Sequence, residues 1–190
     1  MLGVQDTAAG TQSGCRVILV TKKVIYIHLL SNIRYNFVIG NFDFSMELKD
    51  LIQILHDKSL SCVILKSDGE IVQCHRRGVI DLYELLAHTP EVLNGAVVAD
   101  KVVGRGAAAL MVLGRIKQLH TDVLSRPALE MLQQGDISVS YGILVDNIIN
   151  RTGNDICPVE KLTSQAGTAA EALPLIKRFV ENMQAQKINN

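Results

Sequence analysis

The stretch that decides the fold reads AVVADKVVGRGAAALMVL, from Ala96 to Leu113. Its first part, residues 96–100, is short and wholly apolar until its end, as the buried strands of α/β proteins are. Gly104-Arg105-Gly106 then leads into an apolar helix predicted over residues 107–113. A buried strand that passes through glycines into a helix is typical of an α/β sheet, whose ligands bind beyond the carboxyl ends of its strands.

The sequence on the N-terminal side predicts a helix, a hairpin and a second helix. Residues 46–55 place their apolar side chains on one helical face. The β-branched runs at 61–66 and 71–75 are joined by Asp68-Gly69, which is a strong hairpin signal. A helix marked by the apolar residues of 79–86 ends before Pro90.

The sequence on the C-terminal side continues the alternation. A strand is predicted over 119–124, and a helix capped by Ser125 follows it as far as Gln134. Residues 137–145 form a further strand, residues 146–160 are polar and turn-rich with some helical character at 145–149, and residues 169–184 form an amphipathic helix with Pro174 in or near its first turn. The whole order predicts an α/β fold of three αβα layers around a mixed sheet.

Residues 1–45 differ from the rest of the chain. Small and polar residues dominate the opening, and two β-like runs at 16–20 and 24–30 follow without a helix. We interpret Met46 as the natural start, so that residues 1–45 are an N-terminal extension or reflect a mis-assigned start. The alternative is an ordinary N-terminal strand pair. The expected organisation is then an α/β domain over 46–165 and a C-terminal helix over 166–190.

Composition narrows the class of protein. With 48% hydrophobic residues the chain can bury a core, and its 19 basic and 19 acidic residues argue against extended nucleic-acid binding. No stretch approaches the roughly 20 apolar residues of a membrane span, so no membrane partner is expected. The four cysteines (Cys15, Cys62, Cys74 and Cys157) form no Cys-x-x-Cys pair, and a chain of this size needs no disulfide framework, which favours a cytoplasmic protein.

The element order resembles that of the cytidine-deaminase-like fold. More specifically, the stretch from about Met46 to Glu160 resembles DUF1893, an uncharacterised bacterial family with that fold. The resemblance rests on residues 100–109 (DKVVGRGAAA), 125–130 (SRPALE), 149–153 (INRTG) and 157–160 (CPVE). It implies a fold and a pocket, but no established activity.

The resemblance also implies what this chain lacks. Zinc deaminases begin one helix with His-Ala-Glu or Cys-Ala-Glu and the other with Pro-Cys-x-x-Cys. The matching positions here hold Ala107 and Ala109, and then Pro127 followed by Ala128 and Met131. These residues supply no metal ligand and no proton-shuttling carboxylate. We therefore expect no metal, no cofactor and no zinc-dependent deamination.

The helix starts carry the main candidate ligand site. At Gly104, Arg105 and Gly106, free backbone N–H groups and the helix dipole favour an anion, and Arg105 is suited to clamp a phosphate. The second start, with Ser125 and Arg126, is expected alongside. The alternative is a tight strand-to-helix turn with an exposed arginine.

Other candidates lie near that site. Asn150 and Arg151 belong to a polar segment that could bind a ligand or simply form turns. Asp100 and Lys101 end a strand beside the pocket, and solvated strand-end charges are the favoured interpretation. Cys157 is a candidate nucleophile if an arginine lies close to it, and otherwise a small packed residue before a proline.

Three functions follow from these patterns. The first is a pseudoenzyme that binds a nucleotide-like or other anionic small molecule in the vestigial deaminase pocket. The second is a metal-free enzyme with Cys157 as the nucleophile. The third is a homo-oligomeric interaction protein whose helices at 107–113 and 169–184 carry the contacts. The sequence does not identify a substrate or a reaction.

Overall fold

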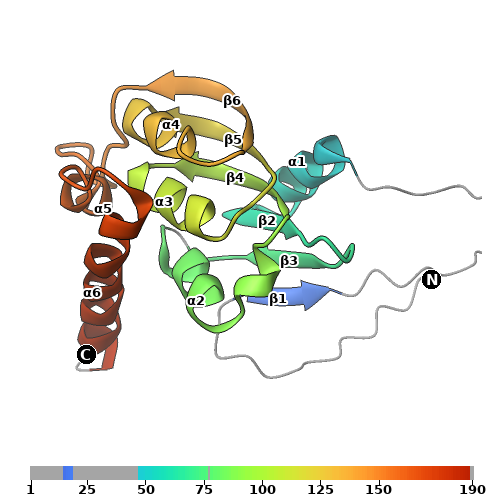
Figure 1. The fold of residues 1–190 in the computed structure, drawn as a ribbon, viewed down its shortest axis with the longest axis horizontal. Coiled ribbons are helices and arrows are strands. Elements are labelled where there is room, and N and C mark those ends of the chain that lie inside the picture. Colours follow the sequence, from blue (N-terminus) through green and yellow to red (C-terminus); the bar gives the residue numbers. More distant parts are fainter. Residues whose placement is uncertain (1–14, 19–46, 77, 189–190) are drawn as a thin grey trace, which may run out of the picture.

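The fold is built on one mixed sheet in the order β1-β3-β2-β4-β5-β6 (Figure 1). It comes from a computed structural model, which describes residues 15–18, 47–76 and 78–188. The strands are β1 (Cys15–Ile18), β2 (Cys62–Leu65), β3 (Ile71–Cys74), β4 (Val97–Val103), β5 (Gln118–Ser125) and β6 (Ser138–Val145). β4, β5 and β6 run parallel, whereas the pairs β1–β3, β2–β3 and β2–β4 are antiparallel. The predicted α/β class with a mixed sheet is confirmed.

Helices cover both faces of the sheet. They are α1 (Leu48–Asp57), α2 (Ile80–His88), α3 (Arg105–Leu113), α4 (Arg126–Leu132), α5 (Pro158–Leu162) and α6 (Ala169–Ile188), with a short 3-10 helix, η1 (Pro90–Val92). α1 packs on β2 and β4 from one side, while α2, α3 and α4 lie over the other face and α6 packs against α2 and α3 (Figure 1). The arrangement therefore has the three predicted layers.

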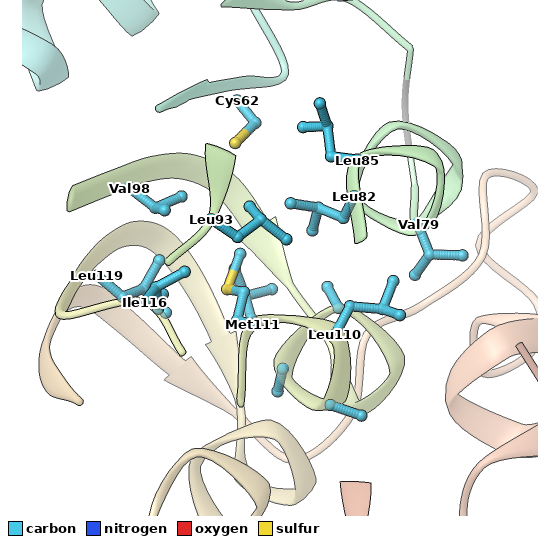
Figure 2. Packing of buried hydrophobic residues seen from close by; sticks show 14 of the residues in the cluster. Cys62, Val79, Leu82, Leu85, Leu93, Val98, Leu110, Met111, Ile116 and Leu119 are labelled. Carbon is cyan, nitrogen blue, oxygen red and sulfur yellow. The ribbon is translucent and has the colours of Figure 1, made fainter. Parts of the chain in front are cut away.

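The larger core surrounds α3. Residues 106–111 of this helix are all buried, and Leu110 and Met111 pack with Leu93 and Leu119 between the sheet and α2 (Figure 2). The three alanines at 107–109 leave room for α4 and α6 to approach. Because this helix is interior, it does not offer the contact surface for a second copy of the chain that its apolar sequence suggested.

A smaller core lies under α1. Leu51 and Leu55 are fully buried against Val63 of β2, Ile71 of β3 and Ala99 of β4. The amphipathic pattern at 46–55 therefore predicted the buried face of this helix correctly.

Several local predictions need correction. The Asp68-Gly69 turn is confirmed, with Gly69 at a φ of 87°. The helical character expected at 145–149 is wrong, because Val145 ends β6 and Ile149 forms a β-bridge with Ile156. The turn-rich prediction for 146–160 missed α5, whereas Pro174 lies inside α6 and near its first turn, as expected.

One strand of the N-terminal segment joins the sheet. β1 is the edge strand, and it pairs in register with β3 from Cys15 opposite Cys74 to Ile18 opposite Ile71. It overlaps the strand predicted over residues 16–20, while the run at 24–30 lies outside the described residues. The natural start at Met46 and the domain boundaries remain predictions.

Candidate functional site

A cavity of about 760 Å³ opens at the carboxyl end of β4. Its walls come from the start of β2, the end of β3, the first turns of α2 and α3, the segment 148–152, the start of α5 and one side of α6. Apolar side chains form much of the wall, including Val79 and Ile80 from α2 and Phe179 and Met183 from α6. This is the edge of the sheet at which the sequence placed a pocket.

The structure brings some of the predicted site residues to this cavity. Gly104, Gly106, Asn150 and Arg151 border it, and so does Cys157.

Arg105, Ser125 and Arg126 are not among the described residues that line the cavity. Their side chains are used elsewhere in the fold.

Glu160 occupies the position between the two helix starts. It is only 3% exposed. Its Oε2 atom accepts hydrogen bonds from the backbone N–H of Arg105, at 3.0 Å, and from the Ser125 hydroxyl, at 3.1 Å. Its Oε1 atom accepts a third from the backbone N–H of Ile148, at 3.0 Å. The carboxylate at these helix starts thus comes from the chain itself.

Close contacts with α5 explain both glycines. A Cβ atom at Gly104 would collide with the Glu160 carboxylate, and one at Gly106 would collide with the Val159 side chain. The sequence associated both glycines with the close approach of an anion, and the group that approaches Gly104 is a carboxylate whereas the one that approaches Gly106 is aliphatic. It did not predict that a residue of α5 supplies that anion.

Arg105 holds three segments together. Its side chain is 12% exposed. The guanidinium donates to the carbonyl oxygens of Thr163 at 3.0 Å, Pro127 at 3.4 Å and Ala166. The expected phosphate clamp therefore has its donors turned away from the cavity, toward the start of α4 and the segment between α5 and α6.

The neighbouring helix start is also engaged. The Ser125 hydroxyl accepts a hydrogen bond from the backbone N–H of Ala128 at 3.2 Å, so the predicted cap is confirmed. The Arg126 side chain is 64% exposed, and its Nε lies 3.0 Å from Asp146 Oδ1. Arg126 therefore faces solvent on the side of β6.

Asp100 is the buried acid of the cavity wall. It is 9% exposed, and its Oδ1 accepts the backbone N–H of Val102 at 2.9 Å. Burial raises the pKa of Asp100 to about 7, although hydrogen bonds from Val102 and from the Cys62 side chain act in the opposite direction. The expectation of a solvated strand-end charge is wrong for this residue, because β2 and its thiol lie against it.

Two cysteines share the wall with Asp100. Cys62 is the register partner of Asp100 across β2 and β4, and of Cys74 across β2 and β3. Both cysteines are buried, at 3% and 1% exposure, and both border the cavity. Their positions could not be read from the sequence, because the pairing of β2 with β4 was not predicted.

Basic side chains lie nearer the opening. His75 and Arg151 are exposed and Lys101 is half-buried, and all three belong to the cavity lining. Arg76 also borders the cavity, but its guanidinium pairs with Asp81 and Glu84 on α2. Among the described lining residues, Lys101 and Arg151 therefore carry the positive charges open to an incoming anion, and His75 adds an imidazole beside them.

The four residues that the resemblance to zinc deaminases singled out lie within helices. Ala107 and Ala109 are buried in α3, and Ala128 and Met131 are buried in α4. Within the described residues, no group of three or more His, Cys, Asp or Glu side chains is placed to hold a metal ion. The same part of the chain contains no helix long and apolar enough to cross a membrane.

Fold and cavity together define a mixed α/β domain with a pocket at the carboxyl end of a central strand. The chain matches the DUF1893 family, a domain of unknown function, over residues 50–180 and belongs to that family. It is similar to the crystal structure of a DUF1893 family protein from Thermotoga maritima, with a TM-score of 0.63 and 23% identity over 73% of this chain and 99% of that one. None of the proteins with a curated description matches the chain.

Proposed function

We propose that this DUF1893 protein binds a nucleotide-like or other anionic small molecule in the cavity at the end of β4. The observation that carries the proposal is the cavity itself, which at about 760 Å³ lies in the range of roughly 300 to 1,000 Å³ of small-molecule sites. Such sites combine apolar walls with a few polar groups that fix orientation.

Different parts of the cavity lining suit different parts of such a ligand. The apolar side chains of α2 and α6 suit the flat, weakly polar body of a ligand. Asp100 at the wall offers a carboxyl group that can donate or accept a hydrogen bond near neutral pH, since its pKa is raised to about 7. His75, Lys101 and Arg151 can pair with an anionic group at the opening. Because Glu160 takes the N–H of Arg105, we expect that group at the opening and not at the α3 start.

Binding can be tested by NMR titration of the full chain with nucleoside monophosphates. We expect shifts in the amide signals of cavity residues such as Val102 and Arg151. Val102→Trp should abolish them, because Val102 borders the cavity and a larger side chain fills it. Ile143→Trp is the matched control: Ile143 is also an exposed aliphatic residue on a strand, at 56% against 46% for Val102. Unchanged binding by Val102→Trp would refute the assignment.

A second candidate function rests on Cys157. This residue is half-buried, borders the same cavity and shares its lining with Arg151. A metal-free enzyme could use its thiolate as a nucleophile, with the arginine stabilising negative charge. Iodoacetamide should then label Cys157 faster than a free thiol at neutral pH, and Arg151→Ala should slow the labelling. Labelling at the rate of a free thiol would leave ligand binding as the better account.

We also propose that the fold is cytidine-deaminase-like, that the protein is cytoplasmic and that it forms a homo-oligomer. If copies associate, α6 is the remaining candidate surface, because α3 is interior. Sedimentation of the full chain and of a variant with charged substitutions on the exposed side of α6 tests that role.

A further inference from the structure

Three of the chain's four cysteines occupy one row across neighbouring strands. Cys15 on β1 is the register partner of Cys74 on β3, which is the partner of Cys62 on β2. Asp100 on β4 is the next position in the same row. The row therefore runs from the edge of the sheet to the strand that bears the cavity.

The pair Cys62 and Cys74 has the spacing that a disulfide needs. Directly opposed residues of antiparallel strands have Cα atoms about 4.5 to 5.5 Å apart. Disulfides form across Cα separations of about 4.4 to 6.8 Å. Opposed side chains also lie on one face of the sheet. Forming the bond therefore requires side-chain rotation, with no need to move one strand past the other.

The cavity gives small reagents a route to this pair. Cys62 and Cys74 are buried with respect to the outer surface, yet both belong to the cavity lining. We propose that Cys62 and Cys74 are a redox pair, which a hydroperoxide entering the cavity converts from two thiols into a cross-strand disulfide.

The reaction balances in two steps. The Cys62 thiol gives its proton to the Asp100 carboxylate, the thiolate attacks one oxygen of hydrogen peroxide, and the O–O bond breaks. Cys62 becomes a sulfenic acid, and the other oxygen leaves as hydroxide, which takes the proton back from Asp100 and becomes water. The Cys74 thiol then attacks the Cys62 sulfur, the S–O bond breaks, and a second water leaves. The two thiols lose two electrons and two protons, and the peroxide is reduced to two waters.

Asp100 is placed to assist the first step. The Cys62 side chain hydrogen-bonds to its carboxylate, which can accept the thiol proton. Burial raises the pKa of Asp100 to about 7, which is nearer to the usual thiol value of about 8.5 than an ordinary aspartate is. Cys157 borders the cavity from α5 and is not opposed to a cysteine on the sheet, so it serves as an internal control.

This inference goes beyond ligand binding and does not depend on it. Oxidation removes the thiol hydrogen that Cys62 directs at Asp100, and so changes the polar wall of the cavity. The hydrogen bonding of Asp100 in the cavity wall would therefore depend on exposure to peroxide.

Peptide mapping of the full chain tests the proposal. Trypsin separates Cys62, on residues 59–66, from Cys74, on residues 67–76, because Lys66 lies between them. Cys15 falls on residues 1–16 and Cys157 on residues 152–161. After treatment of the native protein with hydrogen peroxide, we expect the 59–66 and 67–76 peptides joined, and separated again by a reductant.

The controls decide between this pair and other oxidations. Cys157→Ser should retain the joined peptides, whereas Cys62→Ser and Cys74→Ser should each lose them. The wild-type map stands without any variant, so a variant that folds poorly does not affect the conclusion. Joining of 67–76 to 1–16, or recovery of Cys62 and Cys74 as alkylatable thiols while Cys157 is oxidised, would overturn the proposal. None of these readouts depends on a ligand, so a failed NMR titration leaves this test intact.

Discussion

Glu160 gives the chain an internal anion at the start of α3. Glu160→Ala would leave the Arg105 N–H, the Ser125 hydroxyl and the Ile148 N–H without their acceptor. Hydrogen bonds to a charged group contribute about 1.5 to 3 kcal/mol each, and buried donors left without a partner add to the loss. We expect the free energy of unfolding, measured by urea denaturation, to fall by at least about 3 kcal/mol.

The control for this substitution is Glu91→Ala on η1. Glu91 is exposed, so its removal should change the free energy of unfolding by less than about 0.5 kcal/mol. Equal losses at the two glutamates would show that Glu160 does not hold the helix starts.

Asp100 should make stability depend on pH. Its pKa is about 7 in the folded protein against an ordinary 3.8, so the folded state holds the proton more tightly than the unfolded chain. The stabilisation is complete below the ordinary value and is lost as the pH rises toward 7. Asp100→Asn has no such titration. The free energy of unfolding of this variant relative to wild type should therefore improve as the pH rises from the ordinary pKa of 3.8 to about 7, and should level off above that.

Urea denaturation at a series of pH values measures this effect. Asp68→Asn is the contrasting control, because the Lys66 side chain lowers the pKa of Asp68 at an exposed turn. The free energy of unfolding of Asp68→Asn relative to wild type should change only at lower pH, where it should worsen as the pH rises. A constant difference between Asp100→Asn and wild type across the window would contradict the burial of this carboxyl.

At the residue scale, the sequence predicted the local role of a side chain better than it predicted which distant residue that side chain contacts. The Ser125 hydroxyl caps α4, as the local pattern indicated. The acceptor of the Arg105 N–H was not predictable, because Glu160 lies 55 residues beyond Arg105 in the chain and no local spacing connects them. Asp100 was misjudged for the same reason, since its burial depends on the pairing of β2 with β4.

At the element scale, Arg105 joins α3 to the segment between α5 and α6. Arg105→Met would remove donors from three backbone carbonyl oxygens and should lower the free energy of unfolding by about 3 kcal/mol or more. Arg126→Met is the matched control, because Arg126 is exposed and makes a surface ion pair worth less than about 1 kcal/mol. Urea denaturation of both variants makes the comparison, and a smaller loss at Arg105 than at Arg126 would refute the role.

The contact between β5 and β6 depends on Gly142. A Cβ atom there would lie 2.7 Å from the backbone oxygen of Asp122, and a backbone atom on a paired strand has little room to move. Gly142→Ala should therefore destabilise the protein by about 1 to 3 kcal/mol in thermal unfolding. Ser138→Ala, at an exposed position on the same strand, should stay near wild type. A neutral Gly142→Ala would mean that β6 shifts freely along this edge.

The regular elements were predictable and the short one was not. Apolar periodicity and turn residues identified five strands and five helices between residues 46 and 190, with ends close to those observed. α5 has five residues, too few for a periodic pattern, and its place depends on Glu160 and Val159 packing against the start of α3. Such tertiary contacts cannot be predicted from the local sequence.

At the scale of the whole molecule, the cavity is assembled from segments far apart in the chain. The end of β4 and the start of α3 were predicted to border a pocket, and they do. Phe179 and Met183 of α6 and the thiols of β2 and β3 were not expected there, because the packing of α6 and the order of the sheet bring them in. The sequence therefore indicated where the cavity lies, while the residues that line it depended on the folded structure.

Native mass spectrometry of the purified full chain shows whether this cavity holds a small molecule. We predict a mass excess under native conditions that disappears on denaturation. The excess should be absent from Val102→Trp and present in Ile143→Trp. A native mass equal to that of the polypeptide alone, or an excess that Val102→Trp retains, would contradict the account.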